Sequence, residues 1–413
     1  MSPVSTPITV ELTTYAYGGE SLGRLPDGRA VFVPFALPGE TVQVRLVEEK
    51  AGYARGELQA VLIASPDRLL PRCSHYTLCG GCHYQHIPYE KQLEIKTTIL
   101  RDQMERIARL KDPPIEHCVP SPNPFNYRNH VQFHLTAQGK LGYQQMRSNK
   151  TFALQECHLP EEAINQLWPL LDFEPMPGLK RIHLRQGIEE DMILVLESNV
   201  GEPPEVSVED LAVSVVFQGP ESNQVLAGSE YVVMEVLEHN FRVSAGSFFQ
   251  VNIPVVEAMV SHLLEQLQVQ SNDTVLDIYA GVGLFSAFLA PAAERLIAIE
   301  SDENACEDFT INLNEFDNVE LYQATAEEVL PDLEVRPHVI IVDPPRAGIG
   351  RQAMDGILAM SPEILAYVSC DPATLARDAR RLIEAGYLLR QITPFDVFPQ
   401  TYHIESISIW TRH

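Results

Sequence analysis

Cys370 is the side chain of this 413-residue sequence whose type and position point most directly to chemistry. It follows the apolar run Leu365–Val368, which is typical of a buried parallel strand, and Asp371-Pro372 ends that run abruptly. We therefore expect Cys370 at the carboxyl end of a strand, where open α/β sheets bind their ligands. A helix beginning near Thr374 would direct its positive N-terminus at the thiol and lower its pKa, which would favour a nucleophilic thiolate. The alternative is an inert cysteine, because free cysteine is among the most buried residue types.

Two further segments share this pattern of an apolar strand that ends in a polar or glycine-rich turn. Residues 275–278 lead into Tyr279-Ala280-Gly281-Val282-Gly283, and residues 339–342 lead into Asp343-Pro344-Pro345-Arg346. The glycines let the backbone approach a ligand, and Glu300, about 20 residues further on, is placed to bind two ribose hydroxyls. This motif alone fits nicotinamide cofactors equally well. The third glycine of the dinucleotide fingerprint is missing from the sequence, which favours S-adenosylmethionine.

A second group of candidate ligands is a set of three cysteines on a glycine-rich loop, Cys73, Cys79 and Cys82. Three thiols this close can converge on one metal centre, with a fourth ligand from elsewhere in the chain. Thiolates suit a 4Fe-4S cluster. They would equally bind a structural zinc ion, with or without His83 or His86, and three unrelated reduced cysteines are the third possibility.

The elements that must position these groups divide the sequence into three parts. Residues 1–66 contain short β-type runs separated by glycine and proline turns, which predicts a small barrel of the oligonucleotide-binding type. Residues 67–245 begin with the cysteine loop and one amphipathic helix at 88–110, and then contain β-type runs that predict an antiparallel sheet. In residues 246–413 strands alternate with helices, which predicts a doubly wound, Rossmann-like parallel sheet. We expect its strands at residues 275–279, 295–300, 319–323, 339–343, 366–369 and 406–410. The fold class we expect is therefore a multidomain α/β and β protein.

Composition and charge limit the function classes. The sequence is 45% hydrophobic and 21% charged, as in ordinary soluble globular proteins, and no apolar run approaches the roughly 18 residues of a membrane span. No basic segment followed by an apolar one opens the sequence, so we expect a cytoplasmic protein without a disulfide framework. The net charge of −26 argues against a polyanionic partner by bulk electrostatics. Basic residues nevertheless gather in two places and predict a locally basic working face: Arg346, Arg351, Arg377, Arg380 and Arg381 near the strand ends, and Lys140, Arg147 and Lys150 in the middle segment.

Several motifs together resemble the S-adenosylmethionine-dependent RNA uridine C5-methyltransferases. They are Asp343-Pro-Pro-Arg-Ala-Gly348, Ser369-Cys-Asp-Pro-Ala-Thr-Leu-Ala-Arg-Asp378 and His403-Ile-Glu-Ser406. Residues 18–24 and 33–40 resemble the TRAM domain, an RNA-binding module found in that family, although such a barrel can also be purely structural. The resemblance covers almost the whole chain.

This resemblance implies a mechanism with two catalytic side chains. Carbon 5 of uracil is a poor nucleophile, and a Cys370 thiolate that adds at carbon 6 would turn the ring into an enolate able to take a methyl group. Glu405 matches the family's base for removal of the carbon 5 proton, and burial could raise its pKa to a useful value. The alternative for Glu405 is a solvated carboxylate at a strand start.

The resemblance also implies binding residues and partners. Gln250 and Asp343 would contact the cofactor or its reaction partner, whereas Leu284 is a departure, because many relatives carry Asn there. Cys157 matches the fourth cluster ligand. A TRAM domain together with a cysteine cluster favours 23S rRNA over the T-loop uridine of tRNA as substrate, and we expect a monomer without membrane contact. A protein of another class, an iron-sulfur protein that binds RNA without modifying it, would not need both Cys370 and Glu405.

Overall fold

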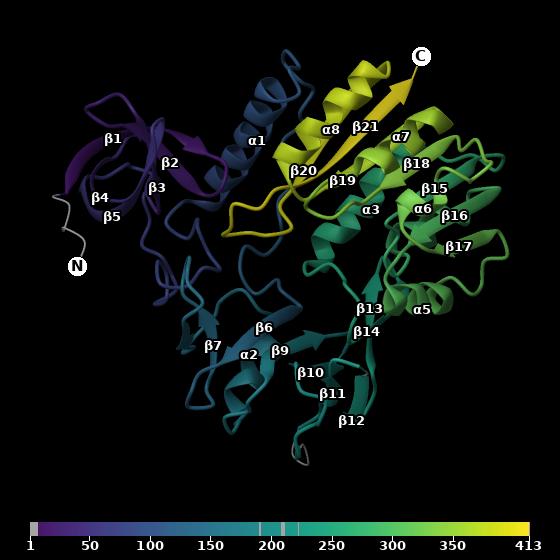
Figure 1. The fold of residues 1–413 in the computed structure, drawn as a ribbon, viewed down its shortest axis with the longest axis horizontal. Helices are drawn as coiled ribbons and strands as arrows, with labels where there is room; N and C mark the ends of the chain where they lie inside the picture. Colours follow the sequence, from purple (N-terminus) through teal and green to yellow (C-terminus); the bar gives the residue numbers. More distant parts are fainter. Residues whose placement is uncertain (1–6, 190, 208–210, 222, 413) are drawn as a thin grey trace.

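The computed structural model describes residues 7–189, 191–207, 211–221 and 223–412, and its N-terminal part is a closed five-stranded barrel (Figure 1). The strands follow one another around the barrel in the order β1-β2-β3-β5-β4, and β3 pairs with β5 in parallel. Alternate residues such as Val31, Val33, Val42 and Val44 point inward and are fully buried, which confirms the predicted barrel. The strands are β1 (Ile8–Ala16), β2 (Glu20–Arg24), β3 (Ala30–Pro34), β4 (Thr41–Glu49) and β5 (Tyr53–Ile63).

The middle of the chain forms a seven-stranded sheet in the order β12-β11-β10-β9-β6-β7-β8, drawn below the other parts in Figure 1. The predicted antiparallel sheet is mixed, because β10 and β11 are parallel. A long connection joins these two strands, and a parallel pair requires such a connection. The elements are β6 (His130–Leu135), β7 (Leu141–Gln144), β8 (Thr151–Ala153), α2 (Glu162–Leu167), the 3₁₀ turn η1 (Trp168–Leu170), β9 (Leu179–Gln186), β10 (Met192–Ser198), β11 (Ser214–Gln218) and β12 (Asn223–Ala227).

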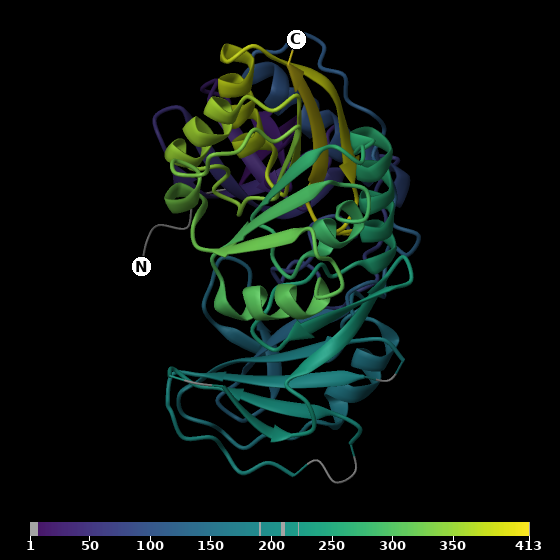
Figure 2. The same cartoon turned by 90° about the vertical axis from the view of Figure 1, so that its right-hand side faces the viewer.

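The C-terminal part is a second seven-stranded sheet, in the order β17-β16-β15-β18-β19-β21-β20, with helices on both faces (Figure 2). The first five strands of that order are parallel, as the sequence predicts. β21 runs antiparallel to both of its neighbours, β19 and β20, and β20 was not among the predicted strands. The strands are β15 (Thr274–Ile278), β16 (Arg295–Glu300), β17 (Val319–Gln323), β18 (Val339–Val342), β19 (Ile364–Ser369), β20 (Tyr387–Phe395) and β21 (Glu405–Arg412).

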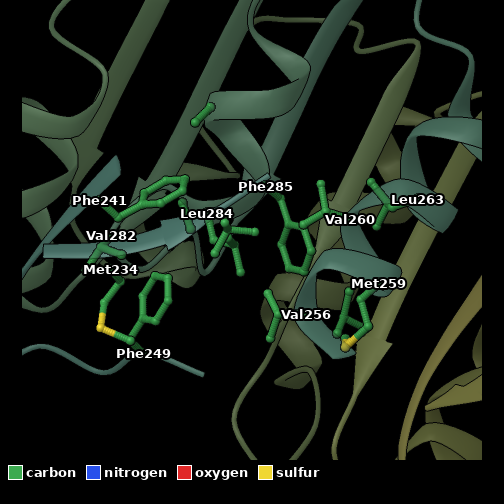
Figure 3. Close-up of a cluster of buried hydrophobic side chains, with 14 of the residues drawn as sticks. Met234, Phe241, Phe249, Val256, Met259, Val260, Leu263, Val282, Leu284 and Phe285 are labelled. Atoms are coloured by element: carbon green, nitrogen blue, oxygen red, sulfur yellow. The ribbon is translucent and has the colours of Figure 1, made fainter. Parts of the chain in front are cut away.

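The helices of this part are α3 (Ile253–Leu267), α4 (Leu284–Leu289), α5 (Glu303–Asn312), α6 (Ala326–Val329), α7 (Arg351–Met360) and α8 (Pro372–Glu384). The hairpin of β13 (Tyr231–Val236) and β14 (His239–Ser244) lies between the two large sheets and packs against α3 and α5 (Figure 1). Leu284, at the start of α4, packs in an apolar cluster with Val282, Phe285 and Phe249 (Figure 3). Its side chain therefore contributes to the apolar core.

Helix α1 (Tyr89–Arg106) is the predicted long helix, and it packs on the C-terminal sheet although the cysteine loop precedes it. Leu100 and Met104 are buried in the same cluster as the side chains of β18 and β19. Lys96 on α1 and Asp396 after β20 form an ion pair with both side chains fully buried. Among the described residues, no helix combines the length and the apolar character needed to cross a bilayer.

Candidate active site

The pairing of β19 with β21 brings Cys370 and Glu405 to the same end of the C-terminal sheet. In the antiparallel pair of β19 and β21, Ser369 lies opposite Ser406, and Cys370 and Glu405 are the residues that adjoin this last pair. The charge of Glu405 acts on the Cys370 thiol, so the two groups are near each other. The thiol and the carboxyl therefore share one end of the sheet, as the two predicted catalytic residues would have to.

Asp343 joins them because it directly follows β18, the strand on the other side of β19. Its backbone N–H donates to the carbonyl of Ile278 at 3.2 Å, which continues the parallel pairing of β15 and β18 by one residue. The ends of β15, β18 and β19 thus meet at one edge, as the three strand-end motifs predict.

The electrostatics of this edge raise the pKa of Glu405 and of Asp343. Glu405 is only 3% exposed, and burial together with the nearby Asp343 raises its pKa well above the usual value, against the opposing effect of Arg346. Burial and the charge of Asp277 raise the pKa of Asp343 to about 7. A carboxyl group with a raised pKa is a stronger base than an exposed one, which is the property that proton abstraction from carbon requires.

The pKa of Cys370 shifts in the direction opposite to the one that the sequence predicted. Burial, then the charges of Glu405 and Asp343, raise it to about 12, where a lowered value was expected. The N-terminus of α8 does not compensate, because the Asp371 side chain occupies its free N–H groups and accepts hydrogen bonds from Ala373 and Thr374, both at 2.9 Å. The thiol is therefore protonated at neutral pH in the protein without RNA.

The segment that leads into Glu405 is held from three directions. The Tyr127 hydroxyl donates to the carbonyl of Pro399 at 3.1 Å, and Gln92 on α1 donates to the Gln400 side-chain oxygen at 3.0 Å. The backbone N–H of His83, in the cysteine loop, donates to the carbonyl of Gln400 at 2.8 Å. No sequence motif indicated these anchors, since each joins residues far apart in the chain.

The turn after β15 has the geometry of a cofactor-binding loop. Gly281 adopts a φ of +56°, and a Cβ atom there would meet nothing within 4 Å, so the backbone faces open space. Glu300, at the end of β16, accepts from the Gly281 N–H at 2.9 Å, so the predicted pair is assembled. Gly283 is needed for close packing, because a Cβ atom there would lie 2.3 Å from the Leu313 side chain.

Tyr279 begins this turn with a φ of +67°, and its ring is partly buried. Gln250, the remaining predicted cofactor contact, is 8% exposed. Its backbone carbonyl accepts from the Asn129 side chain at 3.2 Å, which ties this segment to the central sheet.

The preceding turn, residues 244–247, is fixed from both sides. Asp308 on α5 accepts from the Ser244 and Ser247 hydroxyls at 2.6 Å each, and the buried Arg185 on β9 donates to both carbonyls. This double anchor holds the segment that carries Gln250 between the two large sheets. Sequence reasoning missed both Asp308 and Arg185.

The four predicted cluster cysteines, Cys73, Cys79, Cys82 and Cys157, line one cavity of about 710 Å³ between the cysteine loop and the central sheet. Residue contacts join the two segments, because the Ser74 N–H donates to the carboxylate of Glu156 at 2.6 Å. Burial raises the pKa of all four thiols, to about 11 for Cys157.

The structure also bears on the zinc alternative. In the part of the chain that the structure describes, His83 and His86 do not line this cavity, and the Nδ1 atom of His86 lies 2.6 Å from the Tyr76 hydroxyl. Across the same described residues, no three side chains of the His, Cys, Asp or Glu type are grouped as they would be around one metal ion.

Acidic neighbours neutralise part of the predicted basic face. Arg377 pairs with Asp378 at 2.8 Å and Lys140 with Asp172 at 3.1 Å. Arg381 and Arg147 are likewise paired, with Asp355 and Glu20. Arg346 is exposed beside the acidic strand ends and opposes the rise in the pKa of both Glu405 and Cys370.

A doubly wound sheet with a glycine turn, an acidic residue after the second strand and a thiol beside a buried carboxyl defines a class of α/β group-transfer enzymes. Comparison with known proteins identifies the family. Residues 205–413 match the tRNA (uracil-5-)-methyltransferase family, and residues 5–59 match the TRAM domain. The chain therefore belongs to the tRNA (uracil-5-)-methyltransferase family, whose members are S-adenosylmethionine-dependent RNA uracil C5-methyltransferases.

Individual relatives extend the match to the whole chain. An uncharacterized RNA methyltransferase of Aquifex aeolicus is 33% identical over 98% of this chain and 98% of its own. One from Thermotoga maritima is 32% identical over 96% and 97%. The crystal structure of the Pyrococcus abyssi tRNA (uracil-54, C5)-methyltransferase in complex with S-adenosyl-L-homocysteine has the same fold, with a TM-score of 0.74, 24% identity and coverage of 97% and 99%.

Proposed function

We propose that this protein forms 5-methyluridine in 23S rRNA, with Cys370 as the nucleophile and Glu405 as the base. The observation that supports the proposal is the pairing of β19 with β21, which brings the thiol and the buried carboxyl to the same end of the sheet. An iron-sulfur protein that only binds RNA would have no use for this pair, and family membership supports the same conclusion.

The chemistry we propose uses these two side chains in sequence. The Cys370 thiol loses its proton to solvent, and the thiolate adds to carbon 6 of the uracil while the electron pair of the 5,6 double bond moves to give an enolate with a nucleophilic carbon 5. S-adenosylmethionine, when bound, supplies the methyl group to carbon 5. Glu405 then accepts the carbon 5 proton, the 5,6 double bond re-forms, and the sulfur leaves carbon 6.

The residues proposed to hold the cofactor are Gln250, Tyr279, Gly281, Glu300 and Asp343. The open space in front of Gly281 admits a ligand close to the backbone, and Glu300 lies at the same turn, in position to accept from ribose hydroxyls. Asp343 and Tyr279 follow the neighbouring strands.

We further propose that Cys73, Cys79, Cys82 and Cys157 hold a 4Fe-4S cluster in the cavity that they line. Protein purified without oxygen should be brown, absorb broadly at roughly 400 nm and contain about four irons per chain. Cys157→Ser should lose most of this iron, whereas Cys306→Ser, a change of a cysteine on α5, should keep it. Stoichiometric zinc in anaerobic wild-type protein would contradict the cluster.

The substrate can be tested in cells by deleting the gene and mapping 5-methyluridine in total RNA. We expect a single 23S rRNA uridine to lose its methyl group while tRNA keeps its own. A loss confined to the tRNA T-loop would favour the second candidate, a tRNA methyltransferase. That candidate is supported by the solved tRNA (uracil-54, C5)-methyltransferase, whose fold this chain shares over nearly its full length.

A further inference from the structure

The turn between β1 and β2 of the barrel reaches the catalytic edge of the C-terminal sheet. The Tyr17 hydroxyl donates a 2.6 Å hydrogen bond to Asp371 Oδ2, although 354 residues separate the two in sequence. Asp371 directly follows Cys370, and its other oxygen, Oδ1, caps α8. The carboxylate thus joins the barrel, the thiol and the first turn of the helix.

The same turn also contacts the segment that leads into Glu405. The ring of Tyr17 meets that of Tyr402 edge to face, with centroids 6.0 Å apart. Gly19 lies so close that a Cβ atom there would be 3.1 Å from Tyr402 and 3.2 Å from His83. Both catalytic segments are therefore in contact with one turn of the barrel.

The contact between the barrel and the catalytic segments includes apolar packing in addition to the hydrogen bond of Tyr17. Tyr17 and Tyr402 pack against a buried cluster that also contains Leu37 of the barrel, Ile95 and Ile99 of α1, and Ile404, the residue before Glu405. A barrel attached only by a linker would have no such shared core.

We propose that Tyr17 is a positioning residue that, together with Gly19, fixes Cys370 and Glu405 relative to each other. This inference rests on the proposed function, because it assigns the two segments their catalytic roles. The barrel then has a second task besides RNA binding, since it completes the geometry in which the sulfur reaches carbon 6 and the carboxylate reaches the carbon 5 proton.

The first test removes only the hydroxyl. Tyr17→Phe should lower kcat for methylation by about 10- to 100-fold, because a shift on the order of 1 Å can cost about that much, while KM for RNA stays within about threefold. Tyr53→Phe, on β5 of the same barrel, should leave both constants unchanged. A raised KM with normal kcat would overturn the inference, because the turn would then serve RNA binding alone.

Two glycines provide a matched pair. Gly19 and Gly28 have similar backbone conformations, with φ of +79° and +88°, so alanine is strained equally at both. Only Gly19 faces Tyr402, since a Cβ atom at Gly28 would meet nothing within 4 Å. Gly19→Ala should lower kcat by about tenfold or more and Gly28→Ala should not; equal losses would mean that barrel strain, and not contact, is responsible.

A double-mutant cycle locates the effect at the hydrogen bond. In the Asp371→Asn background, Tyr17→Phe should cost much less than it does in the wild type, because the two side chains act through one contact. Full additivity of the two changes would contradict a shared role.

A readout without methylation separates the inference from the proposed function. The rate at which iodoacetamide alkylates Cys370, followed by mass spectrometry, should rise about threefold or more in Tyr17→Phe, because the segment opens more easily. An unchanged rate would overturn the inference even if the enzyme is active. A wild type that methylates no RNA would instead refute the proposed function.

Discussion

Cys370→Ala should abolish methyl transfer, with a loss of at least about 10³-fold, because the variant has no group to form the bond to carbon 6. Binding of S-adenosylhomocysteine should stay within about threefold, since the thiol acts on uracil and not on the cofactor. The measurements are transfer of a tritiated methyl group to RNA and calorimetric titration with S-adenosylhomocysteine.

Cys118→Ala is the matched control. Cys118 is also buried, and burial raises its pKa to about 12, the same value as for Cys370. It lies in the segment before Val119, which runs beside β20, and not at the end of a strand of the sheet. Normal turnover by Cys370→Ala would end the proposed mechanism, and a comparable loss in Cys118→Ala would show that any buried thiol matters for folding.

The raised pKa of Cys370 sets a condition on the mechanism. A thiol with a pKa of about 12 must lose its proton before or during attack, so activity should increase as pH rises from 7 towards 9. Two of the carboxyl groups that raise this pKa, Glu405 and Asp343, come from the strands on either side of β19.

Local patterns in the sequence predicted the strands of the C-terminal sheet well. Apolar runs that stop at Tyr279, Asp343 and Cys370 identify strand ends, because a buried parallel strand needs apolar side chains on both faces. The sequence also predicted helix α1, at residues 88–110, because its apolar residues recur at helical spacing.

Such local patterns predict neither the direction of a strand nor the part of the protein against which a helix packs. The sequence predicted the last strand near residues 406–410, but only its antiparallel pairing with β19 brings Glu405 to the end of the sheet that carries Cys370. β20 was missed, and α1 was grouped with the cysteine loop although it packs on the C-terminal sheet. Each of these features depends on contacts between distant residues, which short-range periodicity does not encode.

The electrostatics were the least predictable part of the site. A helix N-terminus beside Cys370 predicted a low thiol pKa, but Asp371 occupies that N-terminus and two carboxyl groups arrive from other strands. The sequence also did not predict that acidic residues distant in the chain, such as Glu20 beside Arg147, neutralise part of the basic working face. Charge in a folded site is set by neighbours in space, which the sequence alone does not identify.

Glu405→Gln should separate the two halves of the reaction. If Glu405 removes the carbon 5 proton, it acts after methyl transfer, so the variant should still form the bond from Cys370 to carbon 6 and still methylate carbon 5. Elimination of the thiol requires loss of that proton, so the methylated RNA should stay attached to the protein. We expect a protein–RNA adduct that carries the labelled methyl group and survives denaturing electrophoresis, with multiple turnover reduced by at least about 10²-fold.

The electrostatics of the site favour the first half of the reaction in this variant. Glu405 is the largest charged contributor to the raised pKa of Cys370, and a neutral Gln at that position removes the contribution and lowers the thiol pKa. Adduct formation in Glu405→Gln should therefore be at least as fast as in the wild type. Glu363→Gln, a glutamate just before β19, is the control and should turn over normally without an adduct.

The other outcomes each assign Glu405 a different role. Normal turnover without an adduct would make it a structural carboxyl group, although its 3% exposure and raised pKa argue against a merely solvated one. Neither adduct nor product would mean that Glu405 orients the base before chemistry. The proton would then have to leave through His403 or an ordered water, and because burial and Arg346 lower the pKa of His403 to about 3, that imidazole is neutral but a weak base. His403→Gln in the wild-type background would decide between these two acceptors, since only a route through the imidazole would be lost.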